Sequence, residues 1–550
     1  MLFGIGAMPS PDGETRLQQA RQLLTGDHKD PETARKLLLE IVQSRSASGN
    51  PETLVWADIY LGYIEDRAQH REDAIAWYRK AVTVPRASSS SLSVANFGLQ
   101  QPLVWIRHLD FVDAPSERKT VAPSRIKDGK ADVTNERPSG LTLATHLTAK
   151  ERRENFEALW RIIDAHYAHF TVKSIDWEAI RRRYSARLDA VTGDDDFYQL
   201  LFQLVNELRD THSWLDNYNT PTLADVPDMP VDLFQDHIFV VAGPKAGWEV
   251  VSVDGMTPAE KIESLKPYSR AFSSERAFQR QAARSLLAGT ATELARVALR
   301  SPQGDIETLS LRRRNGKNRP PSHPPLIGLT RQRFVHFGHL AAGLGYIQIE
   351  SFNGHQEIAR EFDRALDALR DAPGLVLDIR DNPGGFGQPA IVGRFVSKRS
   401  LTGFSYIKTG PGHDDLRRSE NYIEPSGPWQ YTRPVALLVN DVTGSAADLF
   451  ALEMRSAASV VTVGTTTHGN LSGVAVYGVL PCGLVVRISN GYITDTKNRP
   501  VEVNGNVPDV RVEPNVRDYL NGKDPVLERA TEVVTEKLRT AVSDRVGSIH

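Results

Sequence analysis

The sequence of 550 residues contains a single cysteine, Cys482, and no apolar run long enough to cross a membrane. One cysteine excludes an internal disulfide and argues against a cysteine-based metal site. The N-terminal segment MLFGIGAMPSPDGE has no basic residue and only a short apolar stretch before Pro9, which is too short for the apolar core of an export signal. The sequence as written therefore predicts a cytoplasmic protein.

An excess of charge of either sign is also missing. The formal net charge is −2, so no overall field favours nucleic acid or an anionic membrane as a partner. The sequence has no HExxH motif, no Walker loop, no GxGxxG pattern after a strand and no cluster of histidine and aspartate ligands. We therefore expect neither a metal nor another cofactor.

The length exceeds what one hydrophobic core can serve and predicts three or four domains. Residues 1–86 show helical periodicity, in ARKLLLEIVQ and AIAWYRKAVTV for example, and resemble tetratricopeptide-type helix pairs. Such helices would form either a docking site for a protein partner or a cap on the rest of the chain, and the sequence favours neither. Residues 87–140, with a serine run and a stretch rich in proline, lysine and aspartate, predict a linker with short strands.

The rest of the chain predicts a mixed α/β protein. Residues 141–222 predict a helical domain, with a capping box of Thr148 and Glu151 before its first helix. Residues 223–333 contain short alternating strands and predict a small β-rich domain. Residues 334–521 alternate strands and helices, as βα units around a buried parallel sheet do, and residues 522–550 predict a C-terminal helix.

Two segments of the predicted sheet point to chemistry, LVLDIRDNPGG and PVALLVNDVTGSAADLFA. Each is a buried strand that ends in a turn, and ligands bind at the carboxyl ends of parallel strands. The second turn places Ser445 at the start of a helix, near unpaired backbone N–H groups. The first contains Gly384 and Gly385, which let a backbone amide approach a substrate closely. A nucleophile beside an oxyanion hole needs these parts, so the pattern predicts a hydrolase.

Four motifs in the order LRDTHSWL, DIRDNPGG, TGSAADLFA and VEVNGNVPDV resemble the tail-specific, or C-terminal processing, serine peptidase superfamily, which includes the tricorn protease core. The resemblance extends over residues 147–521. It implies a crotonase-like ββα catalytic core, a PDZ-like module within residues 223–333 and hydrolysis of peptide bonds. The substrate would be a peptide or a protein, and an oligomer is left open.

The resemblance also offers two bases for Ser445. The bacterial processing peptidases use a lysine, at a position where this sequence has Asn470, and an amide cannot accept a proton. The tricorn-like branch uses a histidine in the first motif and a glutamate near the last motif, and His212 and Glu502 match these positions. The implied triad is therefore Ser445 as nucleophile, His212 as general base and Glu502 as the group that orients the imidazole.

Further residues complete the implied site. The oxyanion would lie between the backbone amide of Ala446 and that of Gly385 or Gly384. His468, close to the position of the missing lysine, is a secondary candidate for the base or a substrate contact. Asp448 would interact with the positive end of the helix that follows the serine, with a supporting role in the site as the alternative.

Each residue also has a purely structural interpretation. Ser445 would then be only an N-cap, His212 a partner of a helix C-terminus and Glu502 an exposed strand carboxylate. The alternative function is a non-catalytic protein that binds a ligand or a peptide on the same fold. A third is a scaffold whose N-terminal helices recruit a partner while the core is vestigial.

Overall fold

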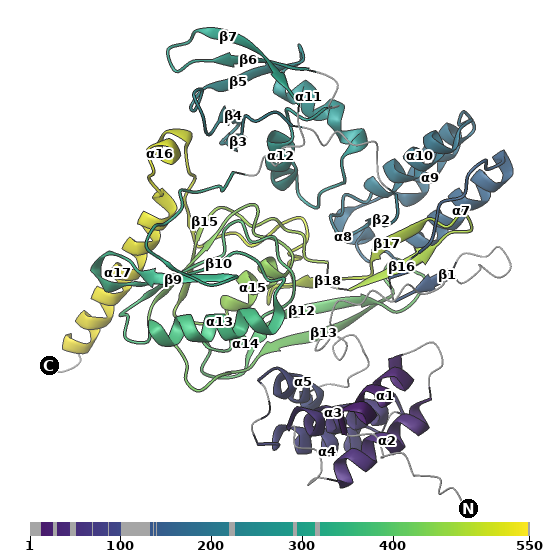
Figure 1. Ribbon diagram of the computed structural model, residues 1–550, viewed down its shortest axis with the longest axis vertical. Coiled ribbons are helices and arrows are strands. Elements are labelled where there is room, and N and C mark those ends of the chain that lie inside the picture. The colour runs from purple at the N-terminus through teal and green to yellow at the C-terminus, as the bar shows by residue number, and fades with distance from the viewer. Residues whose placement is uncertain are drawn as a thin grey trace, which may run out of the picture. The chain divides into compact units, whose positions relative to one another are not determined.

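The computed structural model describes most of the chain, in two compact units that divide between residues 119 and 120. Figure 1 labels their helices and strands. The described residues are 13–25, 30–44, 51–68, 70–85, 87, 89–100, 132–135, 137–138, 140–218, 226–289, 294–313, 320–472 and 474–547. None of the helices among them combines the length and the apolar character that a membrane crossing needs.

The first unit consists of helices, α1 (Gly13–Thr25), α2 (Pro31–Gln43), α3 (Pro51–Arg67), α4 (Arg71–Val82) and α5 (Ser89–Gln100). The start of α2 shows why they form, because the Asp30 side chain accepts a hydrogen bond from the Thr33 amide at 3.0 Å. Helix α5 corrects the prediction of a linker from residue 87. Its Ala95 is fully buried, and its Gly98 lies against the Tyr78 ring, so tertiary packing holds the serine-rich segment in a helix. Residues 101–131 of the predicted linker lie outside the described residues.

In the second unit, strand β1 (Asp132–Thr134) is followed by the helices α7 (Ala149–His166), α8 (Phe170–Lys173), α9 (Trp177–Leu188) and α10 (Asp194–Asn206). The predicted capping box is confirmed, with the Thr148 amide 2.8 Å from the Glu151 carboxylate. The helices share a core with a sheet of order β1-β16-β17-β2, made of Asp132–Thr134, Ala475–Val479, Val485–Ser489 and Trp214–Leu215. Segments from both ends of the unit therefore build one core.

The main sheet has seven strands in the order β19-β15-β14-β11-β10-β9-β8. Strands β10, β11, β14, β15 and β19 are parallel, and β9 and β8 are added antiparallel at one edge. In the order of the sheet, from β19 to β8, the strands span Val510–Arg511, Val460–Gly464, Val435–Val439, Leu375–Asp378, Gly345–Ile349, Val335–His339 and Thr330–Arg331.

Alternate residues of the main sheet enter two different cores. Leu375 and Leu377 of β11 pack with α13 (His355–Ala368), α14 (Pro389–Val392) and α15 (Ala446–Met454), whereas Val376 packs with α17 (Pro525–Gly547). Strands β11 and β14 are buried over their whole length, as expected for a parallel sheet covered on both faces. The carboxyl ends of these two strands lead into the turns that carry the glycine pair and Ser445.

Two smaller sheets complete the second unit. The first is antiparallel, of order β3-β4-β5-β6-β7, with strands Val231–Phe234, His237–Val240, Glu249–Val253, Leu294–Arg300 and Ile306–Arg312. Helices α11 (Pro258–Leu265) and α12 (Glu275–Arg284) interrupt it. The second has the order β13-β12-β18, with strands Leu416–Ile423, Ser400–Lys408 and Gly491–Thr494. Helix α16 (Val516–Leu520) precedes α17.

Candidate active site

Ser445 lies in the tight turn between strand β14 and helix α15. Its backbone has φ 55° and ψ −119°, a conformation that costs a non-glycine residue on the order of 1–3 kcal/mol. The Ser445 amide is held by the Asn470 side-chain oxygen at 2.5 Å and by the Asp448 carboxylate at 3.2 Å. A strained turn between a strand and a helix projects a serine hydroxyl away from the backbone, as a nucleophile requires.

The structure brings His212 to this serine across 233 residues of sequence. The His212 Nε2 atom is 3.1 Å from Ser445 Oγ, within hydrogen-bond distance. The turn between α10 and β2 positions the imidazole: the His212 amide donates to Asp210 Oδ1 at 2.8 Å, and Arg487 of β17 donates to the His212 carbonyl.

The environment of His212 keeps its imidazole neutral. Burial lowers the pKa of His212 to about 4, and the nearby Arg487 guanidinium adds to the effect, whereas Asp210 opposes it. At neutral pH the ring therefore carries no proton on one nitrogen and can accept one. The Nδ1 atom is buried and has no hydrogen-bond partner in the described part of the chain.

The backbone amides of Ala446 and Gly385 are the available donors next to Ser445. Neither donates a hydrogen bond to another described residue. The Gly384 amide, the other predicted donor, is not available, because it donates to Asn382 Oδ1 at 2.9 Å. The prediction was wrong in offering Gly384 as an equal alternative, and its role is spatial. A Cβ atom there would lie 2.7 Å from Ser445 Cβ and 2.8 Å from the Ala446 nitrogen.

The sequence matches two known domain families. The profile of peptidase family S41 matches residues 343–512, which include Ser445 and the glycine pair, and that of the tricorn protease C1 domain matches residues 148–206. The chain carries a peptidase family S41 domain, preceded by a segment that matches the tricorn protease C1 domain. The S41 profile therefore covers the turns that carry the nucleophile and the amides.

Individual relatives resemble parts of this S41 chain. Tricorn protease homolog 1 of Streptomyces coelicolor is 24% identical over 449 residues, which is 76% of this chain and 38% of the relative. Carboxy-terminal processing protease CtpA of Bacillus subtilis is 34% identical over 130 residues, 23% of this chain and 26% of the relative. The chain thus spans less than two thirds of the length of either relative.

Among solved structures, mature CPAF shares the fold. The TM-score is 0.61 at 14% identity, and the match covers 71% of this chain and 98% of mature CPAF. The S41 chain therefore has an S41 peptidase fold, a mixed α/β architecture with several sheets.

The structure buries the Glu502 carboxylate in one cluster with His169 and Asp210. No hydrogen bond joins the Glu502 carboxylate to the His212 ring in the described residues. The carboxylate is fully buried, with Oε1 2.7 Å from Lys173 Nζ and 3.9 Å from His169 Nδ1. Burial raises the pKa of Glu502 to about 7, and the Lys173 ammonium opposes this rise.

Asp210 is a residue of this site that sequence reasoning missed. Its carboxylate accepts hydrogen bonds from the His212 amide and, at 2.8 Å, from the Ser213 hydroxyl. Burial alone would raise the pKa of Asp210, but Lys173, His169 and His212 hold it below its ordinary value. The sequence did contain a signal for it, because an aspartate often accepts a hydrogen bond from the backbone amide two residues later, in an Asx-type turn. Asp210 and His212 have this spacing.

The secondary candidates have separate positions. Asn470 binds the nucleophile's amide, as described above. Asp448 is fully buried, accepts hydrogen bonds from the Gly469 and Asn470 amides at 3.1 Å, and has a pKa raised to about 6 by burial. The His468 ring is stacked on Phe272 with centroids 5.7 Å apart, and its Nε2 is 3.5 Å from Thr211 Oγ1. The contacts of His468 thus hold it against the loop beside His212 rather than against the serine.

A cleft of about 580 Å³ lies beside the site and borders α12. Thr211, His468, Asn470 and Pro383 are among the residues that line it, whereas Ser445 and His212 are not. The lining also includes Arg280, Arg284, Arg331 and Arg380, together with prolines of the segment from 320 to 325. The cleft provides space for an extended substrate next to the carboxyl ends of the main-sheet strands.

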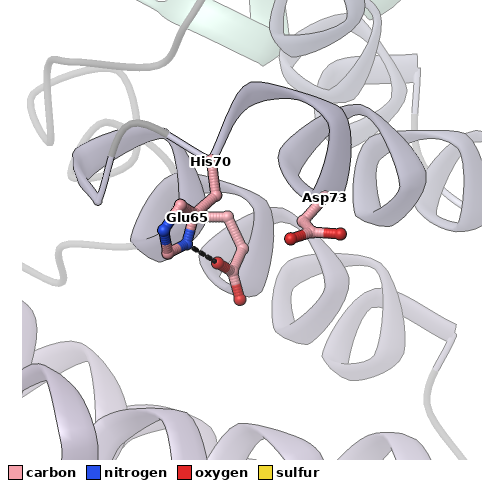
Figure 2. Close-up of side chains that lie close together, drawn as sticks. All are labelled: Glu65, His70 and Asp73. Carbon is pink, nitrogen blue, oxygen red and sulfur yellow. Dashed lines mark hydrogen bonds and ion pairs between the residues drawn. The ribbon is translucent and has the colours of Figure 1, made fainter.

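Within the described part of the chain, two clusters of side chains have the spacing of metal ligands. Figure 2 shows the first, Glu65, His70 and Asp73, in the N-terminal unit. Arg35 and His70 already bind the Glu65 carboxylate, and exposed groups of this kind are common without a metal. The second cluster, His169, Asp210 and Glu502, already contains the Lys173 ammonium as its cation. Neither cluster supports a metal site.

Proposed function

We propose that this S41 chain is a serine peptidase that hydrolyses peptide bonds through an acyl-enzyme on Ser445. The observation that carries the proposal is the 3.1 Å distance between His212 Nε2 and Ser445 Oγ. A serine hydroxyl is a weak nucleophile until an adjacent base removes its proton, and a neutral imidazole at this distance is such a base. The activities named for the relatives, tricorn protease and carboxy-terminal processing protease, support the same chemistry.

The reaction follows from the geometry. Ser445 Oγ attacks the carbonyl carbon of the substrate while His212 Nε2 takes the hydroxyl proton. The oxyanion that forms accepts hydrogen bonds from the Ala446 and Gly385 amides. His212 then gives the proton to the leaving amine, and a water molecule activated by the same imidazole hydrolyses the acyl-enzyme.

Two carboxylates support this pair in different ways. Asp210 fixes the turn that presents His212 through the backbone amide. Glu502, the third member of the expected triad, acts through charge rather than through a hydrogen bond to the ring. Its contact is with Lys173.

The finer architecture and setting are part of the proposal. The main sheet with its covering helices would be a crotonase-like core, the sheet β3–β7 with α11 and α12 a PDZ-like module, and α1–α5 a tetratricopeptide-like unit that docks a protein partner. The substrate would be a peptide or protein in the cleft beside α12. A cytoplasmic location and an oligomer stay predictions from the sequence.

A fluorophosphonate probe tests the function, because it reacts with serines that an adjacent base activates. We expect the full chain to be labelled, and Ser445→Ala to abolish labelling. Ser456→Ala is the matched control, since that hydroxyl binds only the Glu453 carbonyl at the other end of α15. Labelling that survives in Ser445→Ala, or a wild type that is inert to the probe and to peptide libraries, would favour the non-catalytic binding protein.

A further inference from the structure

Lys173 is the last residue of the short helix α8, and its side chain is 1% exposed. An ammonium removed from water is destabilising unless other groups compensate its charge. Neither the sequence motifs nor the serine–histidine chemistry assigns this lysine a task. Its contacts show where its charge acts.

The Lys173 ammonium joins two parts of the site. It lies 2.7 Å from Glu502 Oε1 and donates to the Arg209 carbonyl at 2.6 Å. Arg209 returns a hydrogen bond to the Lys173 carbonyl at 2.9 Å. Arg209 has a positive φ of 47° and lies three residues before His212, so these bonds hold a strained turn in the conformation that aims the imidazole.

The charges around Glu502 explain why a cation is needed there. Glu502 and Asp210 are both buried, and each is near His169 Nδ1, at 3.9 and 3.8 Å. Two carboxylates in one buried site cannot both stay ionised without compensation. Burial and the Asp210 charge both raise the pKa of Glu502, whereas Lys173 lowers it. Without Lys173, the pKa of Glu502 would rise further.

We propose that Lys173 is a positioning residue of the peptidase reaction, which fixes the turn from Arg209 to His212 through its ion pair with Glu502. The inference rests on the proposed function and deepens it. In this arrangement Glu502 makes no hydrogen bond to the imidazole among the described residues, and the ion pair with Lys173 places a balanced pair of charges next to the turn. The third member of the expected triad then works only together with a lysine of helix α8.

The experiment is a double-mutant cycle on the full chain with Lys173→Met, Glu502→Gln and the double variant. The measurement is the second-order rate constant for labelling of Ser445 by the fluorophosphonate probe, as a function of pH. We expect Lys173→Met to slow labelling by about 10- to 100-fold, a part of what a general base contributes. If Lys173 acts through Glu502, the double variant labels no more slowly than Glu502→Gln alone.

The pH profile separates this role from a merely structural one. Loss of Lys173 raises the pKa of both Glu502 and His212, because the lysine lowers each of them. The acid limb of the labelling profile should therefore shift to higher pH in Lys173→Met, and Lys173→Arg, which keeps the charge, should restore the wild-type midpoint. The other titratable groups around the pair, unchanged in all variants, include Asp210, His169, Arg487, Asp448, His468 and Tyr167.

Two controls test whether a slower labelling rate comes from loss of folding. Lys408→Met removes another buried lysine, which donates to the Gly412 carbonyl in the β12–β13 hairpin, and should leave the profile unshifted. The melting temperature of Lys173→Met should lie below that of the double variant, because a single deletion leaves an uncompensated buried charge. If the single variant does not fold, the double variant and Lys173→Arg still decide the question.

Three results would overturn the inference: a wild-type rate and profile in Lys173→Met, a double variant whose loss equals the product of the two single losses, or an acid limb in Lys173→Arg shifted as in Lys173→Met. Failure of the proposed function is different, because the wild-type protein itself would then show no labelling that depends on Ser445.

Discussion

At the scale of single residues, the site depends on backbone conformations that only certain side chains tolerate. Ser445 has a positive φ, and Gly384 approaches it so closely that no Cβ atom fits. The hydrogen bonds from the Ser445 amide to Asn470 and Asp448 stabilise this geometry. Strain of this kind persists only where the surroundings over-determine the conformation, and it is concentrated at functional sites.

Gly384→Ala should reduce labelling of Ser445 by on the order of 10²-fold or more, the usual effect of losing one oxyanion donor. The added Cβ would lie 2.5 Å from the Gly444 carbonyl and 2.8 Å from the Ala446 nitrogen, so it displaces that amide. Gly304→Ala is the matched control, because Gly304 has nearly the same φ, 100° against 99°, but nothing within 4 Å of the added Cβ. Equal losses in the two variants would attribute the effect to backbone strain alone.

His468 should make the stability of the protein depend on pH. Burial lowers its pKa to about 3 from the ordinary 6.5, with His212 and Arg276 adding to the effect. Because the unfolded chain binds a proton below pH 6.5 and the folded chain does not, the stabilisation is present above pH 6.5 and is lost as the pH falls towards 3. Relative to His468→Gln, the wild-type free energy of unfolding should fall by about 2 kcal/mol between pH 7.5 and pH 5.

Urea denaturation of both proteins at the two pH values measures this difference. Parallel changes in the wild type and in His468→Gln would contradict a buried neutral imidazole at this position. The raised pKa values of Glu502 and Asp448 have the opposite sign, but they are common to both proteins and cancel in the comparison.

At the scale of elements, α12 connects the five-stranded sheet to the loops around the site. Arg276 donates to the Thr467 carbonyl at 2.6 Å and to the Asn504 carbonyl at 3.0 Å. Arg280 binds Asp441, in the loop before Ser445, at 2.7 Å. One helix therefore braces the loop after β14, the loop of His468 and the segment of Glu502.

Arg276→Ala should lower the rate of Ser445 labelling by about 10-fold, since several hydrogen bonds from a charged donor are lost, each contributing roughly 1.5–3 kcal/mol. The loop from 467 to 470 would then hold the Ser445 amide less firmly. Arg296→Ala, at an exposed arginine of β6 in the same sheet, should leave the rate unchanged. A wild-type rate in Arg276→Ala would show that α12 does not support the site.

The sequence predicted the elements with strong local signals and missed those defined by tertiary packing. Strands β11 and β14 and the helix after Ser445 follow from apolar runs that end in turn residues. Helix α14 is a single turn, because Pro389 begins it and Gly393 ends it. The serine run predicted a linker where the structure has helix α5. The sequence could not show how much Asp210 and Lys173 matter for the site, because the importance of a buried charge depends on partners from distant segments.

At the scale of the molecule, the second unit holds the whole candidate site. Ser445, His212, Glu502 and Lys173 all lie after residue 120. The four-stranded sheet also extends to the start of this unit, because β1 pairs with β16 from Asp132 to Thr134. The expected helical domain of residues 141–222 therefore shares its core with strands near residue 480.

A chain that starts at residue 120 should label at Ser445 with the wild-type rate, because the first unit contributes no residue to the described site. A chain that starts at residue 140 lacks β1 and should melt at a lower temperature, since β16 becomes an unprotected edge. Labelling and thermal denaturation of the two truncated proteins check this. A large loss of labelling in the protein that starts at residue 120 would show that the N-terminal helices contribute to the reaction.

The pairing of β2 with β17 has a consequence for synthesis on the ribosome. Trp214 and Leu215, directly after His212, find their partner strand only at Arg487 and Val486. A nascent chain in which Ser445 has left the ribosome, but Val486 and Arg487 have not, lacks the strand that holds the turn of His212 in place. We therefore expect the nucleophile to stay unactivated until residues 486 and 487 have been synthesised, which protects a growing polypeptide from its own chemistry.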